Sequence, residues 1–303
     1  MSQSSKPFVS VIIPVFNDNE RLKICLNALA KQTYSGDAHE IIVVDNGSTQ
    51  DVKSVTEQFS KVLLAYESRP GSYIARNKAL SIAKGEVIAF TDADCIPEPD
   101  WIEKGVANLL SQPNVGLVAG RIDLFARNPN KPSPVELYES LEMSFPQDKF
   151  IEEKQFGATA NLFTFKQVLD DVGFFDENLK SGGDLQWGQR VFARGYKQLY
   201  ADDACIKHPT RDSWEDLRKR SLRIIGGKYD LMRKTGQSNL TAIKDLILFL
   251  KPPFRSFLRI WTDARLQGPK QKFQFTVVML RLRYVGIQER LRLQLGGGIS
   301  DRG

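Results

Sequence analysis

Two aspartates, one residue apart, follow a pattern typical of a buried strand. Asp92 and Asp94 stand directly after the apolar run 87–90. Carboxylates this close repel each other unless a proton or a cation compensates their charge. A hard divalent cation with oxygen ligands can do so, and a cation with open positions can hold a diphosphate. The pair therefore predicts a metal-assisted site for a phosphate-bearing ligand.

The elements around this pair alternate between strand and helix. Apolar runs predict strands at 8–14, 41–45, 62–66, 87–91 and 115–120, and the segments between them, at 20–32, 51–60, 72–84 and 98–110, predict helices. Short apolar strands separated by helices are typical of an α/β fold with a doubly wound, mostly parallel sheet. We therefore expect the ligand beyond the carboxyl ends of the strands, where such sheets bind.

Polar loops follow these strands at the expected places. They are residues 14–18, 45–49, 70–72 and 92–94. Because the carboxyl ends of parallel strands lie at one edge of a sheet, these loops converge on that edge. Four converging loops predict a binding site rather than a scatter of solvated turns.

Size and composition are those of an ordinary soluble protein. The chain has 303 residues, of which 42% are hydrophobic and 26% are charged. This fits one large α/β domain, or one domain with an appendage. No apolar run reaches the length of a membrane span, and the first residues do not resemble a signal peptide. The three cysteines are widely spaced, so we expect reduced thiols in a cytoplasmic protein.

Charge is distributed unevenly along the chain. The net charge is +6, but the residues from Lys207 onward hold 21 lysines and arginines against 8 aspartates and glutamates. A basic region can meet nucleic acid, anionic lipid or an acidic polymer. Residues 243–295 interleave apolar and basic side chains, as interfacial helices do. We expect either peripheral contact with an anionic membrane at the inner face of the plasma membrane, or helices that pack on the catalytic domain. No recognised motif supports binding to nucleic acid.

Several blocks of residues, taken in order, resemble the family 2 glycosyltransferases, which have a GT-A fold. The resemblance covers roughly residues 8–210 and is specific as a set. Its blocks are Ser10–Asn17, Val43–Asp51, Gly71–Asn77, Asp92–Asp94, Gly157–Phe165, Val172–Asp176 and Gly182–Arg190.

The resemblance implies a domain plan and a reaction. The catalytic domain would be residues 1–240, with a nucleotide-binding half near 8–125 and an acceptor half near 126–240, and residues 241–303 would form a basic amphipathic helical region. The enzyme would move a sugar from a nucleotide diphosphate sugar to a hydroxyl of a glycan or lipid-linked acceptor, with inversion, in polysaccharide or cell-envelope glycan biosynthesis. Mn²⁺ or Mg²⁺ would act as the Lewis acid that stabilises the departing diphosphate.

The resemblance also implies roles for single residues. Asp184 would be the general base that takes the proton of the acceptor hydroxyl. The donor would be bound by Pro14, Phe16, Asp45, Asn46, Arg76, Asp92, Ala93 and Asp94. The metal would be held by Asp94, Asp92 and His208, with Asp94 the direct ligand. The acceptor would meet Gly183 and Trp187.

Two positions depart from the family pattern. Many relatives carry consecutive aspartates where this chain has Asp45-Asn46, so a UDP sugar is the first choice of donor while GDP and dTDP sugars stay open. Relatives often have Glu-Asp at the position of Gly183-Asp184, which keeps the base but changes the acceptor pocket. Trp187, one helical turn beyond Asp184, fits a sugar platform or the core about equally well.

Two other functions compete with this prediction. A sugar nucleotidyltransferase would need a glycine-rich, basic loop after the first strand, and residues 14–18 contain neither glycine nor a basic residue. A non-catalytic paralogue that binds sugar nucleotides or lipid would be expected to have lost its carboxylates. Asp92, Asp94 and Asp184 are all present, so the sequence favours the enzyme.

Overall fold

A computed structural model describes residues 6–234, 246–247 and 249–295. The chain divides into two compact units. The first consists of Met1–Asp123, Phe145–Asn178 and Gly183–His208, and the second of Leu124–Ser144, Leu179–Gly182 and Pro209–Gly303. This division differs from the predicted boundary at residue 240, because helices on both sides of that residue pack together in the second unit.

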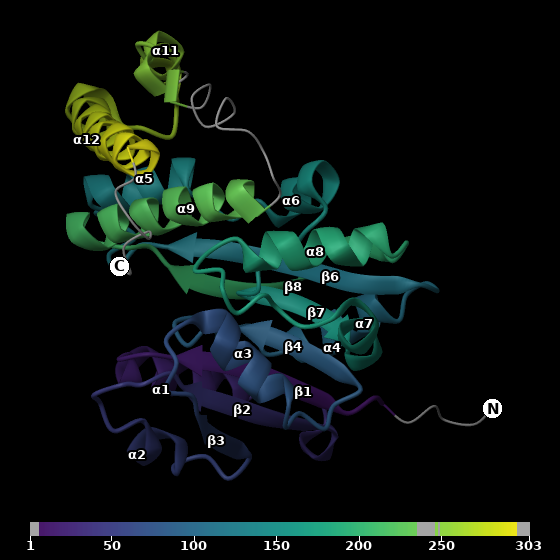
Figure 1. The fold of residues 1–303 in the computed structure, drawn as a ribbon. Coiled ribbons are helices and arrows are strands. Elements are labelled where there is room, and N and C mark those ends of the chain that lie inside the picture. The colour runs from purple at the N-terminus through teal and green to yellow at the C-terminus, as the bar shows by residue number, and fades with distance from the viewer. Residues whose placement is uncertain (1–5, 235–245, 248, 296–303) are drawn as a thin grey trace. The chain divides into compact units, whose positions relative to one another are not determined.

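A mixed sheet forms the centre of the first unit (Figure 1). Its strand order within the described residues is β3-β2-β1-β4-β7-β6-β8-β5. The strands are β1 (Val9–Val15), β2 (His39–Asp45), β3 (Val62–Tyr66), β4 (Val87–Thr91), β5 (Ile96–Pro97), β6 (Val115–Phe125), β7 (Asn161–Phe165) and β8 (Lys197–Pro209). The pairs β1–β2, β2–β3 and β1–β4 are parallel, whereas β7 runs antiparallel to β4 and β6. The prediction of a mostly parallel α/β sheet is confirmed, with an antiparallel half that the apolar pattern did not indicate.

Helices cover the parallel strands β1, β2 and β4 and bury them. Every residue of β4 is buried, as are all but one of β1, which is the pattern of strands covered on both faces. In the described residues the helices of this unit are α1 (Asn19–Leu29), α2 (Val52–Thr56), α3 (Ser72–Leu80), α4 (Trp101–Leu109), α6 (Gln147–Lys154), α7 (Lys166–Val172) and α8 (Gly183–Ala193), with a short 3-10 turn, η1 (Gly36–Ala38). Helix α3 packs on β1 and β2, and α4 packs on β4 and β7. Buried strands thus hold the loops at their ends in fixed positions.

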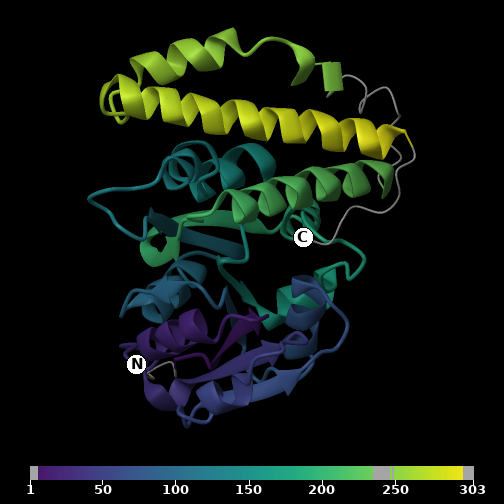
Figure 2. The ribbon, with the colours of Figure 1, turned by 90° about the vertical axis from the view of Figure 1, so that its left-hand side faces the viewer.

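The second unit is helical in its described part. It contains α5 (Pro134–Glu142), α9 (Trp214–Lys234), α11 (Phe254–Thr262) and α12 (Gly268–Gln294). The long helix α12, yellow in Figure 2, contacts α5, α9 and α11. Ser133 and Glu136 form a capping box at the start of α5, with Pro134 in the first turn, and this combination is typical of a well-defined helix start.

Helix α9 runs through two consecutive glycines. Gly226 and Gly227 lie inside the helix, which continues to Lys234, and both are buried. A Cβ on Gly227 would lie 2.5 Å from Cβ of Ser181. The glycine therefore serves close packing inside the second unit, and its cost to helix stability is about 1 kcal/mol.

None of the helices in the described ranges combines the length and the apolar character that crossing a bilayer requires.

Candidate active site

The loops after β1 and β2 are locked together by side chains. Asn17 adopts a left-handed backbone conformation, and its Oδ1 accepts hydrogen bonds from the backbone N and the hydroxyl of Thr49 at 2.8 and 3.1 Å. Its own N–H donates to the hydroxyl of Ser48 at 2.9 Å. The predicted nucleotide loops of both strands thus form one rigid rim.

Asp45 and Asn46 shape that rim from the end of β2. Asp45 Oδ1 accepts from the N–H of Ser48 at 2.9 Å, which closes a turn. Asn46 Nδ2 donates to the carbonyls of Glu67 and Arg69 at 2.9 and 2.8 Å, and its Oδ1 accepts from the N–H of Gly71 at 2.8 Å. The amide of Asn46 therefore holds the loop that leads into α3. Its contact with a nucleoside base stays a prediction.

Pro14 and Phe16 lie at the carboxyl end of β1. Pro14 is in β1, in register with Val44 of β2. Phe16 follows the strand, and 62% of its surface is exposed. An exposed aromatic ring beside a rigid loop offers a stacking surface, and the predicted base contact of this pair remains to be tested.

Arg76 forms a buried ion pair with Asp92. The guanidinium is only 3% exposed, and its Nη2 lies 2.5 Å from Oδ1 of Asp92. Arg76 lies in the middle of α3 (Ser72–Leu80). Arg76 thus compensates the charge of one of the two aspartates.

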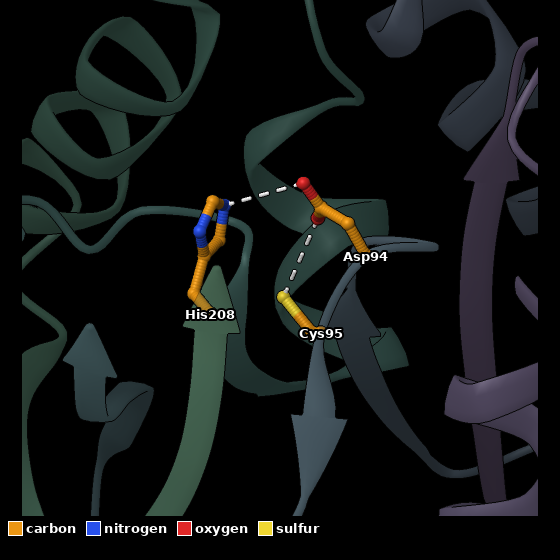
Figure 3. A group of neighbouring side chains, drawn as sticks. All are labelled: Asp94, Cys95 and His208. Carbon is orange, nitrogen blue, oxygen red and sulfur yellow. Dashed lines mark hydrogen bonds and ion pairs between the residues drawn. The ribbon is translucent and has the colours of Figure 1, made fainter. Parts of the chain in front are cut away.

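Asp94 meets His208 in the first unit (Figure 3). Asp94 Oδ2 lies 3.6 Å from Nε2 of His208, which lies one residue before the end of β8 and is 4% exposed. A backbone hydrogen bond from Cys95 N to Asp92 O, 3.1 Å long, closes the turn that presents Asp94 and buries Ala93. Donor atoms of Asp94, Cys95 and His208 all lie within 4.8 Å of one another.

This group fits a divalent cation. A carboxylate oxygen and an imidazole nitrogen are ligands that Mn²⁺ accepts, and Mg²⁺ takes the oxygen. The pKa of Asp18 is raised because the side chain is buried; Arg21 lowers it and the charge of Asp94 raises it further. Two neighbouring carboxylates in this state favour an added cation. Asp92, predicted as a further ligand, does not belong to the group in this structure because it is paired with Arg76.

Cys95 adds a thiol beside the same carboxylate. Its Sγ is 3.9 Å from Oδ1 of Asp94, and the residue is fully buried. Burial raises the pKa of this thiol well above its ordinary value, and the charges of Asp94 and Asp92 raise it further. A protonated, buried thiol is unreactive.

Asp184 lies in the first turn of α8 and is half-buried. Its Oδ1 accepts hydrogen bonds from the N–H of Leu185 at 3.0 Å and from the hydroxyl of Tyr73 at 3.2 Å. Burial raises the pKa of this carboxyl, while the hydrogen bond from Leu185, the charge of Arg76 and the Tyr73 hydroxyl lower it. A carboxylate with a raised pKa at a helix start has the properties of a general base.

The two predicted acceptor residues are not free to meet a sugar. Trp187 is fully buried, and its Nε1 donates to the carbonyl of Gly173 at 3.0 Å. The prediction of a sugar platform there is wrong, because the indole belongs to the core beside Phe175. Gly183 is also buried, and a Cβ on it would lie 2.7 Å from the ring of Tyr73. The lack of a side chain at Gly183 leaves room for the ring of Tyr73.

Sequence reasoning missed Tyr73 and Arg21. Tyr73 stood inside a quoted motif, but nothing in the spacing indicated that its hydroxyl reaches α8. Arg21 Nη1 lies 3.4 Å from Oδ2 of Asp18 and 3.9 Å from Oδ2 of Asp94. The spacing of Asp18 and Arg21 signals an ordinary helical pair, whereas the contact with Asp94 depends on the fold.

These observations define an α/β enzyme whose charged groups gather in loops and helix starts next to strand ends. Comparison with known proteins gives the family. The profile of glycosyl transferase family 2 matches residues 10–175, more than half of the chain. Glycosyltransferase AglE of Haloferax volcanii is 38% identical over 230 residues, which cover 74% of this chain and 74% of that protein. The chain therefore belongs to glycosyl transferase family 2, and it is a glycosyltransferase.

Solved structures share the fold. A mannosyltransferase of Pyrobaculum calidifontis, PcManGT, solved in complex with GDP-Man and Mn²⁺, aligns with a TM-score of 0.58 and 19% identity over 97% of this chain and 75% of that one. The structure of GalNAc-T7 with UDP, GalNAc and Mn²⁺ aligns with a TM-score of 0.55 and 18% identity over 69% of this chain and 45% of that one. The predicted GT-A architecture is confirmed by these similarities.

Proposed function

We propose that this glycosyltransferase moves a sugar from a nucleotide diphosphate donor to a hydroxyl of a glycan or lipid-linked acceptor, with inversion at the anomeric carbon. The observation that carries the proposal is the meeting of Asp94 and His208 at 3.6 Å, from elements far apart in the chain. This pair can hold the Mn²⁺ or Mg²⁺ that a diphosphate needs. The bound structures of PcManGT and GalNAc-T7 contain Mn²⁺ with a nucleotide sugar or nucleotide, which supports the same ligand class here.

The residues divide the reaction between them. Asp184 takes the proton of the acceptor hydroxyl while the oxygen attacks the anomeric carbon, and the bond from that carbon to the phosphate oxygen breaks with its electrons going to the leaving diphosphate. A divalent metal held by Asp94 and His208 would supply Lewis-acid stabilisation of the leaving group. Arg76 holds Asp92 in place beside the donor through their ion pair. Phe16 and Asp45 line the nucleoside, and Pro14 supports them from β1.

Release of nucleoside diphosphate tests this function. The purified protein is incubated with UDP, GDP and dTDP sugars, with Mn²⁺ or with a chelator, and the nucleoside diphosphate is quantified. We expect metal-dependent release from one donor class, through slow transfer to water, with UDP sugars the first candidate. A protein that binds a donor but never releases its diphosphate, with any acceptor preparation, would be the non-catalytic paralogue instead.

We also propose that α11 contacts an anionic membrane surface. Phe254, Leu258 and Trp261 are 74%, 68% and 51% exposed and recur at the spacing of one helical face. Ile260, from the other face, is buried against Leu266, Phe275 and Met279. Lys251 and Arg255 flank the exposed face. An apolar helical face bordered by basic residues is typical of an interfacial helix, and it would place the enzyme beside a lipid-linked acceptor.

Vesicle binding tests the contact. The double substitution Phe254→Glu and Leu258→Glu should weaken binding to phosphatidylglycerol-containing vesicles more than tenfold. Burial of each apolar side chain in the membrane contributes about 2 kcal/mol to the binding free energy. Leu110→Glu, at a position that is 55% exposed in the first unit, is the matched control and should bind normally. Co-sedimentation at low salt measures the effect. Equal binding by the double variant, or indifference of the unmodified protein to anionic vesicles, would contradict the proposal.

A further inference from the structure

Tyr73 is placed to control the carboxylate of Asp184. Its hydroxyl donates to Oδ1 of Asp184 at 3.2 Å. The residue lies in the first turn of α3 and is 7% exposed. The ring occupies the space into which a side chain at the residue before Asp184 would extend, since a Cβ on Gly183 would approach it to 2.7 Å. Gly183 and Tyr73 thus fit each other as a pair.

The ring is held rigidly on its other side. It stacks on Phe175 with the ring centroids 5.6 Å apart and an angle of 27° between the planes. Asn77, one turn further along α3, fixes the backbone of Phe175: its Nδ2 donates to the carbonyl at 2.8 Å, and its Oδ1 accepts from the N–H at 3.1 Å. Phe175 also packs on Phe90. The position of the hydroxyl is therefore set by the core of the first unit.

We propose that Tyr73 is a positioning residue that aims the Asp184 carboxylate and keeps it ionised, and that Gly183 is present to admit its ring. The inference rests on the proposed role of Asp184 as general base. It explains why this chain has glycine where relatives often have glutamate: a larger side chain there would displace the tyrosine.

The side chains next to Asp184 lower its pKa, which is what keeping its carboxylate ionised requires. Two side chains of α3, Arg76 and Tyr73, lower the pKa of Asp184. Burial of the carboxyl has the larger effect and raises its pKa. The pKa of Tyr73 itself is raised far above its ordinary value, mainly by burial and then by the charge of Asp184. Tyr73 consequently stays protonated and remains a donor across the working pH range. Losing its hydrogen bond should raise the pKa of Asp184.

Tyr73→Phe tests the proposal because it removes the hydroxyl and keeps the ring. Activity requires ionised Asp184, so the acid limb of the profile of kcat against pH should move to higher pH by about one unit. At pH values below the acid limb, kcat of the variant should be about tenfold lower than kcat of the unmodified protein, with the donor KM unchanged. Tyr196→Phe is the matched control, since its hydroxyl donates to Asp171 over the same 3.2 Å at an exposed site. That variant should leave the profile in place.

Two further measurements separate the possible failures. Gly183→Ala should shift the acid limb as Tyr73→Phe does, because the new methyl group must displace the ring. The carboxyl titration of Asp184, followed by carbon NMR and assigned by its loss in Asp184→Asn, reports the pKa without any turnover. A folded Tyr73→Phe protein with an unchanged Asp184 titration overturns the proposal. An absence of diphosphate release by the unmodified protein overturns the proposed function instead, and the titration still decides the role of Tyr73.

Discussion

Asp184→Asn should lower kcat for sugar transfer by about a thousandfold, within the range that positioned general bases contribute. The asparagine keeps the size of the side chain and can still accept a hydrogen bond from Leu185, but its amide cannot take a proton. Because Asp184 does not belong to the group of Asp94, Cys95 and His208, donor binding should persist. Steady-state kinetics with saturating donor, combined with a direct measurement of donor affinity, would show a loss confined to kcat.

The matched control for this prediction is Asp171→Asn. Asp171 is an exposed aspartate on the neighbouring helix α7, and the change should leave kcat within twofold. If Asp184→Asn retained more than a tenth of the activity, another group would have to be the base. If it instead lost donor affinity with kcat preserved, Asp184 would belong to the donor site.

Asp94→Ala should abolish the metal dependence of donor binding and lower kcat/KM by about a hundredfold to a thousandfold. A bound metal contributes several kcal/mol to stabilising a leaving diphosphate, and each 1.36 kcal/mol corresponds to a tenfold change in rate. The substitution removes the carboxylate that faces both His208 and Arg21. Without that carboxylate, the negative charge that favours a bound cation beside His208 would be lost.

Asp37→Ala provides the control, because Asp37 is exposed and lies in the short 3-10 turn before β2. Titration of Mn²⁺ into each variant in the presence of nucleotide gives the metal affinity. Unchanged Mn²⁺ dependence in the Asp94 variant would show that the metal site lies elsewhere. If the Asp94 variant also lost affinity for the nucleotide in the absence of metal, Asp94 would contact the donor directly.

The parallel half of the fold could be predicted from the sequence because β1, β2 and β4 are almost wholly buried apolar strands. The residues of β3 and β4 match the predicted ranges 62–66 and 87–91. Continuous apolar runs are a strong local signal. Strand β8 was missed, since Lys197–Pro209 alternates charged and apolar residues irregularly. The antiparallel pairing of β6 with β7 depends on long-range register, which periodicity does not contain.

The candidate site shows the same limit. Motif order singled out Asp94 and Asp184, because each stands at the start of a loop or helix with a local signature. The partners of these residues could not be predicted from spacing. Tyr73 and Asp184 come from different helices, and Arg21 reaches Asp94 from α1. The sequence fitted Trp187 to a sugar platform and to the core about equally well, and its full burial against Phe175 places it in the core.

The most direct test of the account is the thermal stability of the purified protein with UDP, GDP and dTDP, each with and without Mn²⁺. A ligand that binds only the native state raises Tm, by an amount that grows with its concentration over Kd. The account predicts a Tm increase for one nucleotide that requires Mn²⁺ and is absent in Asp94→Ala. No shift with any nucleotide, or an equal shift in the variant, would contradict a metal-assisted nucleotide-sugar site at Asp94.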